Sequence, residues 1–151
     1  MFLMLLHKRI ILPMNKGINY PQKIMLAWIE AIGGNSEIRD WLLKNGYQEL
    51  GLFIFALRNM DNARMWLMEN GFPHLLALIN GVEGNAQALT WLEANKYDLL
   101  KVIAVAADGD AGAKKWLMIN DKILAMLALK IEFVKDEIER DNNDVHKISP
   151  N

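Results

Sequence analysis

Residues 41–47 read Trp-Leu-Leu-Lys-Asn-Gly-Tyr, and related segments recur along this 151-residue chain at a fixed interval. A Trp-Leu pair returns every 25 residues, and its tryptophans are Trp41, Trp66, Trp91 and Trp116. The residues four positions after them are Asn45, Asn70, Asn95 and Asn120. In the first three copies an aromatic residue follows two positions later. A period of this length is typical of stacked supersecondary units.

The period divides the middle of the chain into four units, 35–59, 60–84, 85–109 and 110–134. In the first half of a unit, apolar or small residues recur at i, i+3, i+4 and i+7, which places them on one face of a helix about nine residues long. Asn35, Asp61 and Asp110 are of types that favour helix N-caps, and they mark its start. Asn-Gly at 45–46 and 70–71 marks its end.

The second half of each unit predicts another helix, which other helices cover on both sides. It begins at Gln48, Pro73 or Asp98 and continues as an almost unbroken apolar run. The unit then ends on a residue such as Gly84 or Gly109, a type that readily adopts positive φ after a helix. We therefore expect helical hairpins whose second helices form a central layer.

Both ends of the repeat depart from the pattern. Residues 21–34 contain only a second-half helix, which makes 21–139 the expected helical-repeat domain. In the last unit Val134 replaces the terminal glycine, so its second helix should continue to about Glu139. Polar residues at 141–144 should then end the structure, and we expect residues 140–151 to be a mobile polar tail.

An apolar segment with His-Lys-Arg in its middle, at residues 7–9, opens the N-terminal region, which comprises residues 1–20. Its apolar run is too short for a transmembrane helix, which needs roughly 20 residues. The basic residues follow the apolar run, whereas a signal peptide has the opposite order. Two interpretations stay open: a helix or strand packed on the end of the domain, or residues upstream of a natural start at Met14.

On these repeats, the chain resembles the α-solenoid class of tandem α/α-hairpin proteins, whose familiar members are HEAT and armadillo repeats. The resemblance covers about residues 21–139, although the 25-residue unit is much shorter than in those families. It implies an all-α fold, an α-α superhelix of about four and a half hairpins. It also implies an extended curved surface that binds partners.

Composition argues against several functional classes. The chain is 52% hydrophobic and 23% charged, as in ordinary globular proteins. It has no cysteine, which excludes disulfides and thiolate metal sites and fits the cytoplasm, the location we expect. Three scattered histidines form no metal-ligand pair, and we expect no metal or cofactor. Residues 24–131 hold ten bases and twelve acids, so we do not expect nucleic-acid binding.

Structural roles are expected for the repeated residues. The tryptophans lie on the same predicted helical stripe as leucine, which indicates buried contacts between repeats rather than a ligand site. The asparagines should satisfy backbone groups where one helix turns into the next. With two serines, one threonine and no phosphate loop, the chain offers little for nucleophilic catalysis.

The positions that vary from unit to unit lie on the second helices, and they indicate where a partner binds. The candidate residues are Phe55, Leu76, Asn80, Lys101, Val105 and Met126. Apolar area beside charge favours a protein contact, so we expect a non-catalytic protein- or peptide-binding module. The alternative is that other helices bury the second helices on both sides, in which case these residues form no exposed binding face. Two further alternatives are self-association, through the N-terminal segment or the solenoid end, and a small enzyme using carboxylates Glu83, Asp108 and Asp110 at the turns.

Overall fold

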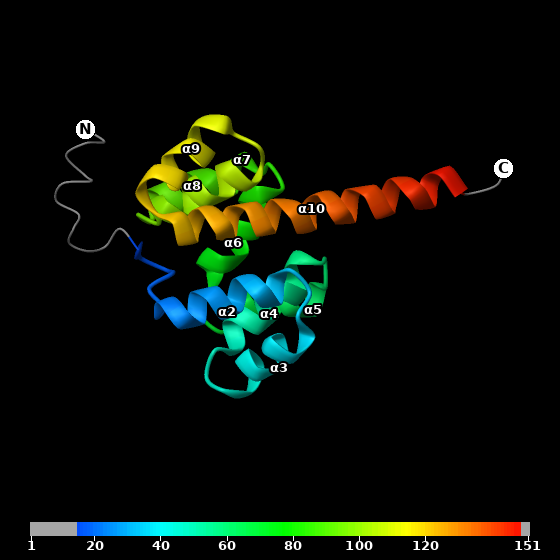
Figure 1. Cartoon of the computed structure of the whole chain (residues 1–151), viewed down its shortest axis with the longest axis horizontal. Coiled ribbons are helices and arrows are strands. Elements are labelled where there is room, and N and C mark those ends of the chain that lie inside the picture. Colours follow the sequence, from blue (N-terminus) through cyan, green and yellow to red (C-terminus); the bar gives the residue numbers. More distant parts are fainter. Residues whose placement is uncertain (1–14, 149–151) are drawn as a thin grey trace.

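The structure is a computed structural model that describes residues 15–148. Over this range the chain is all-α and forms nine helices and no strand (Figure 1). The helices are α2 (Gln22–Ile32), α3 (Ser36–Lys44), α4 (Gln48–Leu57), α5 (Asp61–Glu69), α6 (Pro73–Val82), α7 (Ala86–Ala94), α8 (Asp98–Ala107), α9 (Ala111–Asn120) and α10 (Lys122–Ile148).

Each 25-residue unit forms one pair of consecutive helices. We call α3, α5, α7 and α9 the A helices, and we call α2, α4, α6, α8 and α10 the B helices. The A helices are nine or ten residues long. The B helices begin at Gln48, Pro73 and Asp98, which confirms the starts predicted from the sequence. Helix α2 is the expected half unit.

The first residue of each unit is the N-cap of its A helix. The side chains of Asn35, Asn85 and Asp110 each accept a hydrogen bond from the backbone N–H three residues later, at 2.9–3.0 Å. Asp61 departs from its predicted role, because it is the first residue of α5 and Met60 holds the extended cap backbone. One position further on, the carboxylate of Asp61 still lies in the first turn, where a negative charge stabilises the helix dipole.

The turns between units adopt positive φ whether or not a glycine is present. Gly84 has φ of 88°, and Asn59 reaches 68° at the equivalent position. Asparagine tolerates this region better than other residues with a Cβ atom. The shared backbone makes successive hairpins repeat the same geometry.

The B helices form a closed circuit of contacts around the core. Helices α2, α4, α6, α8 and α10 each pack on the next, and α10 also packs on α2. Figure 1 shows α10 running alongside α2, although they are the last and first described helices. A linear stack of repeats has contacts only between neighbours, so this contact between the ends was not expected. Trp28 of α2 donates from Nε1 to the carbonyl of Leu50 at 3.1 Å in the buried centre.

Helix α10 is longer than the sequence predicted. It continues to Ile148, so the expected end near Glu139 and the unstructured residues 141–144 are wrong. No glycine or proline interrupts it before Pro150, and each added residue gains a backbone hydrogen bond once the helix exists. An ion pair of 3.0 Å joins Glu137 to Arg58 at the end of α4. Residues 1–14 and 149–151 lie outside the described range, so the predictions about them stay predictions.

Candidate binding grooves

None of the four repeated tryptophans is fully buried, and two of them are exposed. Trp41 is 48% exposed and Trp91 36%, whereas the leucine after each tryptophan is completely buried. The expectation of buried tryptophans is therefore wrong for Trp41 and Trp91, whereas Trp66 and Trp116 are partly buried against the core. The leucine of each pair is the residue that occupies the core. In the first three copies the indole stacks on the aromatic residue six positions later. The stacked rings are 6.3 Å apart for Trp41 and Tyr47, and 5.7 Å apart for Trp91 and Tyr97.

The repeated asparagines bind the backbone of the same motif. The Nδ2 group of Asn45 donates to the carbonyl of Trp41 at 2.8 Å. The other three copies make the same bond to the tryptophan four residues earlier, each at 2.9 Å. In the second and third copies the same carbonyl also accepts the backbone N–H of that asparagine, so the side-chain amide adds a second hydrogen bond at the end of the A helix. Tryptophan and asparagine together fix the A-to-B turn in every unit.

One groove lies between α5 and α7, with α6 as its floor. Leu76 and Asn80 of α6 line it, together with Met68 and Trp91 from the flanking A helices. Its volume is about 360 Å³. The lining is mainly apolar, with the amide of Asn80 as a polar group on the floor. The groove can therefore accept an apolar side chain beside the amide of Asn80, whose Oδ1 also accepts a 3.4 Å hydrogen bond from Arg64.

A second groove repeats the first one 25 residues further along the chain. It lies between α7 and α9, with a volume of about 480 Å³. Lys101 and Val105 take the places of Leu76 and Asn80, and Trp116 takes the place of Trp91. Glu93 of α7 lies on the wall opposite Trp116 of α9, and it forms a 3.0 Å ion pair with Lys101. The equivalent positions thus build two neighbouring grooves of different chemistry.

The corresponding place on α4 is filled by the chain itself. Gly51 is buried, and a Cβ atom there would lie 2.5 Å from Cδ2 of Leu43. The guanidinium of Arg39 lies over the ring of Phe55, 4.6 Å from its centroid. Phe55 is therefore covered rather than open to a partner. The alternative that the B helices are buried on both sides holds at α4.

The remaining predicted residue, Met126, lies on α10 and is 47% exposed. No A helix follows α10 in the described residues, so Met126 lines no groove of the same kind. The six candidates are thus divided among four places: Leu76 and Asn80 in one groove, Lys101 and Val105 in the next, Phe55 under Arg39, and Met126 on the outer face of α10.

A cluster that the sequence did not indicate lies at the N-terminal ends of the B helices. The Nζ of Lys16 is 2.8 Å from the carbonyl of Asn95 and lies over the ring of Tyr97. His74 stacks on the same ring, with centroids 4.9 Å apart. Burial lowers the pKa of His74, and the positive charge of Lys16 lowers it further. Lys16 and Asn95 are 79 residues apart, so no local pattern could indicate their contact.

The carboxylates at the inter-repeat turns have structural partners. Glu83 forms an ion pair with Arg64 at 3.1 Å, and Asp110 caps α9. Asp108 lies 2.6 Å from Nζ of Lys135. In residues 15–148 no cluster of three His, Asp or Glu side chains could hold a metal ion. Over the same range, no helix has the length and apolarity needed to cross a membrane.

Comparisons of the chain with known protein families, with curated proteins and with solved structures find no match.

Proposed function

We propose that this protein is a non-catalytic binding module whose outer grooves hold a peptide segment of a protein partner. The observation that carries the proposal is the repetition of one groove on α6 and α8 with different floor residues. Trp91 and Trp116 occupy the same place in the two grooves. The floors change from Leu76 and Asn80 to Lys101 and Val105, and one wall residue changes from Met68 to Glu93. A repeated groove whose lining residues differ from copy to copy is the arrangement expected of a surface that recognises a specific ligand.

The spacing of the two grooves favours one extended ligand. They flank the same helix, α7, and adjacent packed helices are about 8–10 Å apart. A peptide could thus place one apolar side chain in each groove, and full burial of such a side chain contributes about 1.5–3 kcal/mol. Binding at the first groove raises the effective concentration at the second. The Lys101–Glu93 pair at the second groove would select polar groups beside the apolar anchor.

The proposal includes the way in which the helical hairpins are stacked. We interpret the four and a half hairpins as a short α-α superhelix whose ends meet where α10 packs on α2. The class uses its continuous helical surface to bind partners. The cytoplasmic location expected from the absence of cysteine is part of this proposal. The sequences of peptides selected in the experiment below would indicate the kind of partner segment that binds.

A peptide-display selection on the full chain tests the proposed function. Peptides that bind should be measured again on two groove variants, Leu76→Glu and Val105→Glu. Each variant replaces an apolar side chain on one groove floor by a charged one, so affinity should fall at least tenfold. The matched control is Met65→Glu, because Met65 is 56% exposed and lies outside the lining of both grooves. Equal affinity for wild type and both groove variants, with unchanged melting, would contradict the proposal.

A further inference from the structure

Helices α10 and α2 pack on each other without an A helix over their contact in residues 15–148. Every other adjacent pair in the circuit of B helices has an A helix packed on both members: α3 on α2 and α4, α5 on α4 and α6, α7 on α6 and α8, and α9 on α8 and α10. We call the uncovered contact the α10–α2 seam. A further A helix would pack here if the repeat continued.

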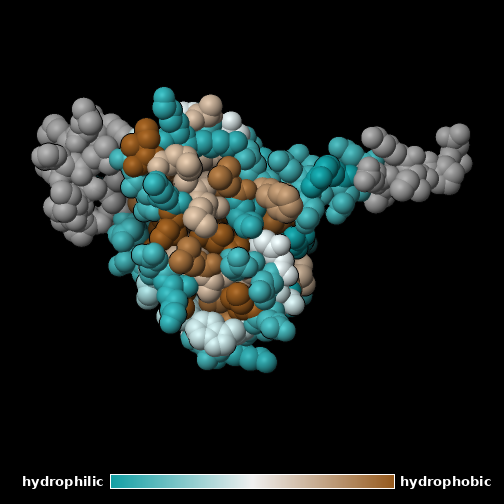
Figure 2. Space-filling model, viewed as in Figure 1, coloured by the Kyte–Doolittle hydropathy of each residue, from teal (hydrophilic) through white to brown (hydrophobic). Residues whose placement is uncertain are grey.

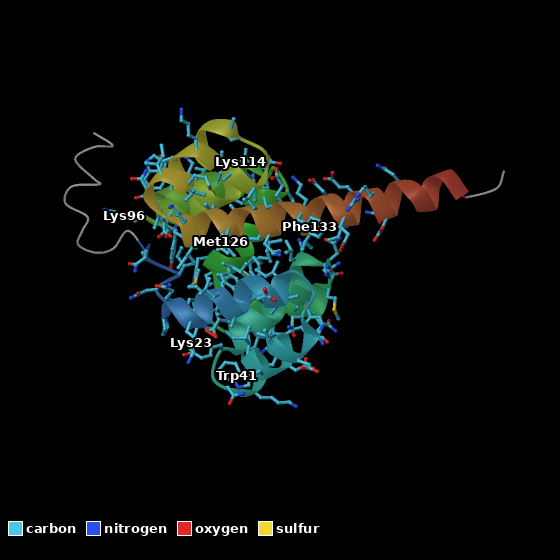
Figure 3. The ribbon with its side chains drawn as sticks, viewed as in Figure 1. Lys23, Trp41, Lys96, Lys114, Met126 and Phe133 are labelled. Carbon is cyan, nitrogen blue, oxygen red and sulfur yellow. The ribbon has the colours of Figure 1, made fainter. Side chains whose placement is uncertain are left out.

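The seam exposes an apolar stripe. Met126, Leu129 and Phe133 of α10 are 47%, 48% and 52% exposed, and their spacing of i, i+3 and i+7 places them on one face of the helix. Leu26 of α2 is 37% exposed. Figure 2 shows apolar surface over α10 and α2, and Figure 3 shows Met126 and Phe133 along α10. The side chains that would contact a further helix are thus open to solvent.

The charges on the seam are separated along its length. Helices α2 and α10 run in the same direction in Figure 1, and each carries an exposed lysine near its N-terminal end, Lys23 on α2 and Lys122 on α10. The carboxylate of Asp121 caps α10, where the partial positive charge of the helix N-terminus offsets it. The exposed acids lie further along the two helices, Glu30 on α2 and Asp136 on α10.

The other charged residues of α10 up to residue 141 maintain this separation. Three of them are paired with other helices: Glu132 with Lys114, Lys135 with Asp108, and Glu137 with Arg58. Lys130 lies in the middle of the seam, where its side chain approaches Gly33 after α2. Glu139, Arg140 and Asp141 together add a negative charge to the C-terminal end. The seam is therefore positive at one end and negative at the other.

The negative end of α10 projects beyond the other helices (Figure 1). Residues 139–143 are all exposed. Most of the stability of helices in proteins comes from tertiary packing. A helix end that leaves the body of the molecule can gain such packing from a partner.

We propose that a second copy of this chain docks on the α10–α2 seam about a two-fold axis, with the two α10 helices antiparallel. An axis perpendicular to α10 near Leu129 places Lys122 of one copy opposite the partner's Asp136, because each lies seven residues from Leu129. The two apolar stripes then cover each other. The projecting negative end of each α10 passes the positive end of the other seam.

The separation of charge favours this occupant over a uniformly charged helix. An acidic helix would meet Glu30 and Asp136, and a basic helix would meet Lys23 and Lys122, so like charges would oppose either one. A second copy in the parallel orientation would also place like charges together. The antiparallel copy presents opposite charge at both ends of the seam.

Sedimentation equilibrium of the full chain over a range of concentrations tests the docking surface. The wild type should dimerise, and Met126→Asp with Phe133→Asp should be monomeric. The control Met65→Asp changes an exposed methionine outside the seam and should dimerise like the wild type. Circular dichroism verifies that each variant folds. The groove variant Leu76→Glu should leave the dimer unchanged, because the apolar seam residues line neither groove, which separates this test from that of the proposed function.

A charge exchange tests the antiparallel orientation. Lys122→Glu and Asp136→Lys should each weaken self-association roughly tenfold, because each change places like charges opposite each other. An equimolar mixture of the two variants should recover the wild-type affinity, since the mixed dimer again pairs opposite charges at both ends of the seam. The double variant should recover it for the same reason.

Four results would overturn the proposal. A wild-type chain that is monomeric up to roughly 1 mM would show that the seam does not bind a second copy. A dimer that Met126→Asp with Phe133→Asp leaves intact would use another surface. Failure of the mixture to recover affinity, with both variants folded, would exclude the antiparallel pairing. A chain that dimerises only after removal of residues 1–14 would assign the seam to that segment.

Discussion

Nζ of Lys135 lies 2.6 Å from Oδ1 of Asp108, at the C-terminal end of α8. The same ammonium group donates to the carbonyl of Val82 at 2.7 Å, at the C-terminal end of α6. Helix C-termini carry partial negative charge and free carbonyl groups, so a lysine is well placed there. One side chain of α10 thus binds two B helices, one of which is not its neighbour in the circuit.

Replacing Lys135 by methionine should lower the free energy of unfolding by about 1–3 kcal/mol, because two hydrogen bonds from a charged group are lost. Urea denaturation measures the change. The matched control is Lys115→Met, since Lys115 is exposed on α9 and should change stability by less than about 0.5 kcal/mol. Equal effects of the two substitutions would show that the contact with α6 and α8 contributes nothing.

The buried leucine of the motif should matter more than its tryptophan. Leu67→Ala removes a completely buried side chain and should cost about 2–5 kcal/mol. Trp41→Ala removes a ring that is 48% exposed and stacked on Tyr47, so about 1 kcal/mol is expected. Thermal and urea unfolding of both variants check this order. A Trp41→Ala loss as large as that of Leu67→Ala would place the indole in the core.

Gly51 and Leu43 should be energetically coupled. Gly51→Ala places a methyl group 2.5 Å from Leu43, and we expect a loss of about 1–3 kcal/mol from overpacking. Combining it with Leu43→Ala removes the clash, so the double variant should be more stable than the sum of the single effects predicts. A double-mutant cycle in urea measures the coupling. Additive effects would show that Leu43 does not fill the place above Gly51.

Protonation of His74 should destabilise the fold. Burial lowers the pKa of His74 below its ordinary value of 6.5, so the unfolded chain binds this proton more readily than the folded chain. Stability should therefore be complete above about pH 7 and fall as the pH drops below about 6.5, through the lowered pKa of the folded state. His74→Gln should show a weaker fall in urea midpoint between about pH 7.5 and 5.5. An identical fall in wild type and variant would contradict this role.

Local signals in the sequence were sufficient to predict where most of the helices begin. Cap residues such as Asn35 and Asp110, and the first-turn Pro73, mark helix starts because they satisfy or spare backbone groups. The contact of α10 with α2 has no local signal, because it joins segments about 100 residues apart along the printed sequence. Adjacent tryptophan and leucine point about 100° apart on a helix, and a broad apolar stripe can include both. Spacing alone therefore did not show which one reaches the core.

The candidate site was predicted only in part for a similar reason. Variation between units indicated Leu76 and Val105, which do line grooves. It also indicated Phe55, but whether that position is open depends on Arg39 in the preceding helix. The apolar seam that includes Met126 exists because no further unit follows α10 in the described residues, and its pairing with α2 depends on tertiary packing.

The most direct test of the proposed binding function is backbone amide NMR of the full chain during titration with a display-selected peptide. We predict that the largest chemical-shift changes will lie around Leu76 and Asn80 of α6 and around Lys101 and Val105 of α8. The amide chemical shifts around Gly51, where Leu43 fills the equivalent place, should change little. Changes confined to helices outside these two grooves, with α6 and α8 unaffected, would contradict the account.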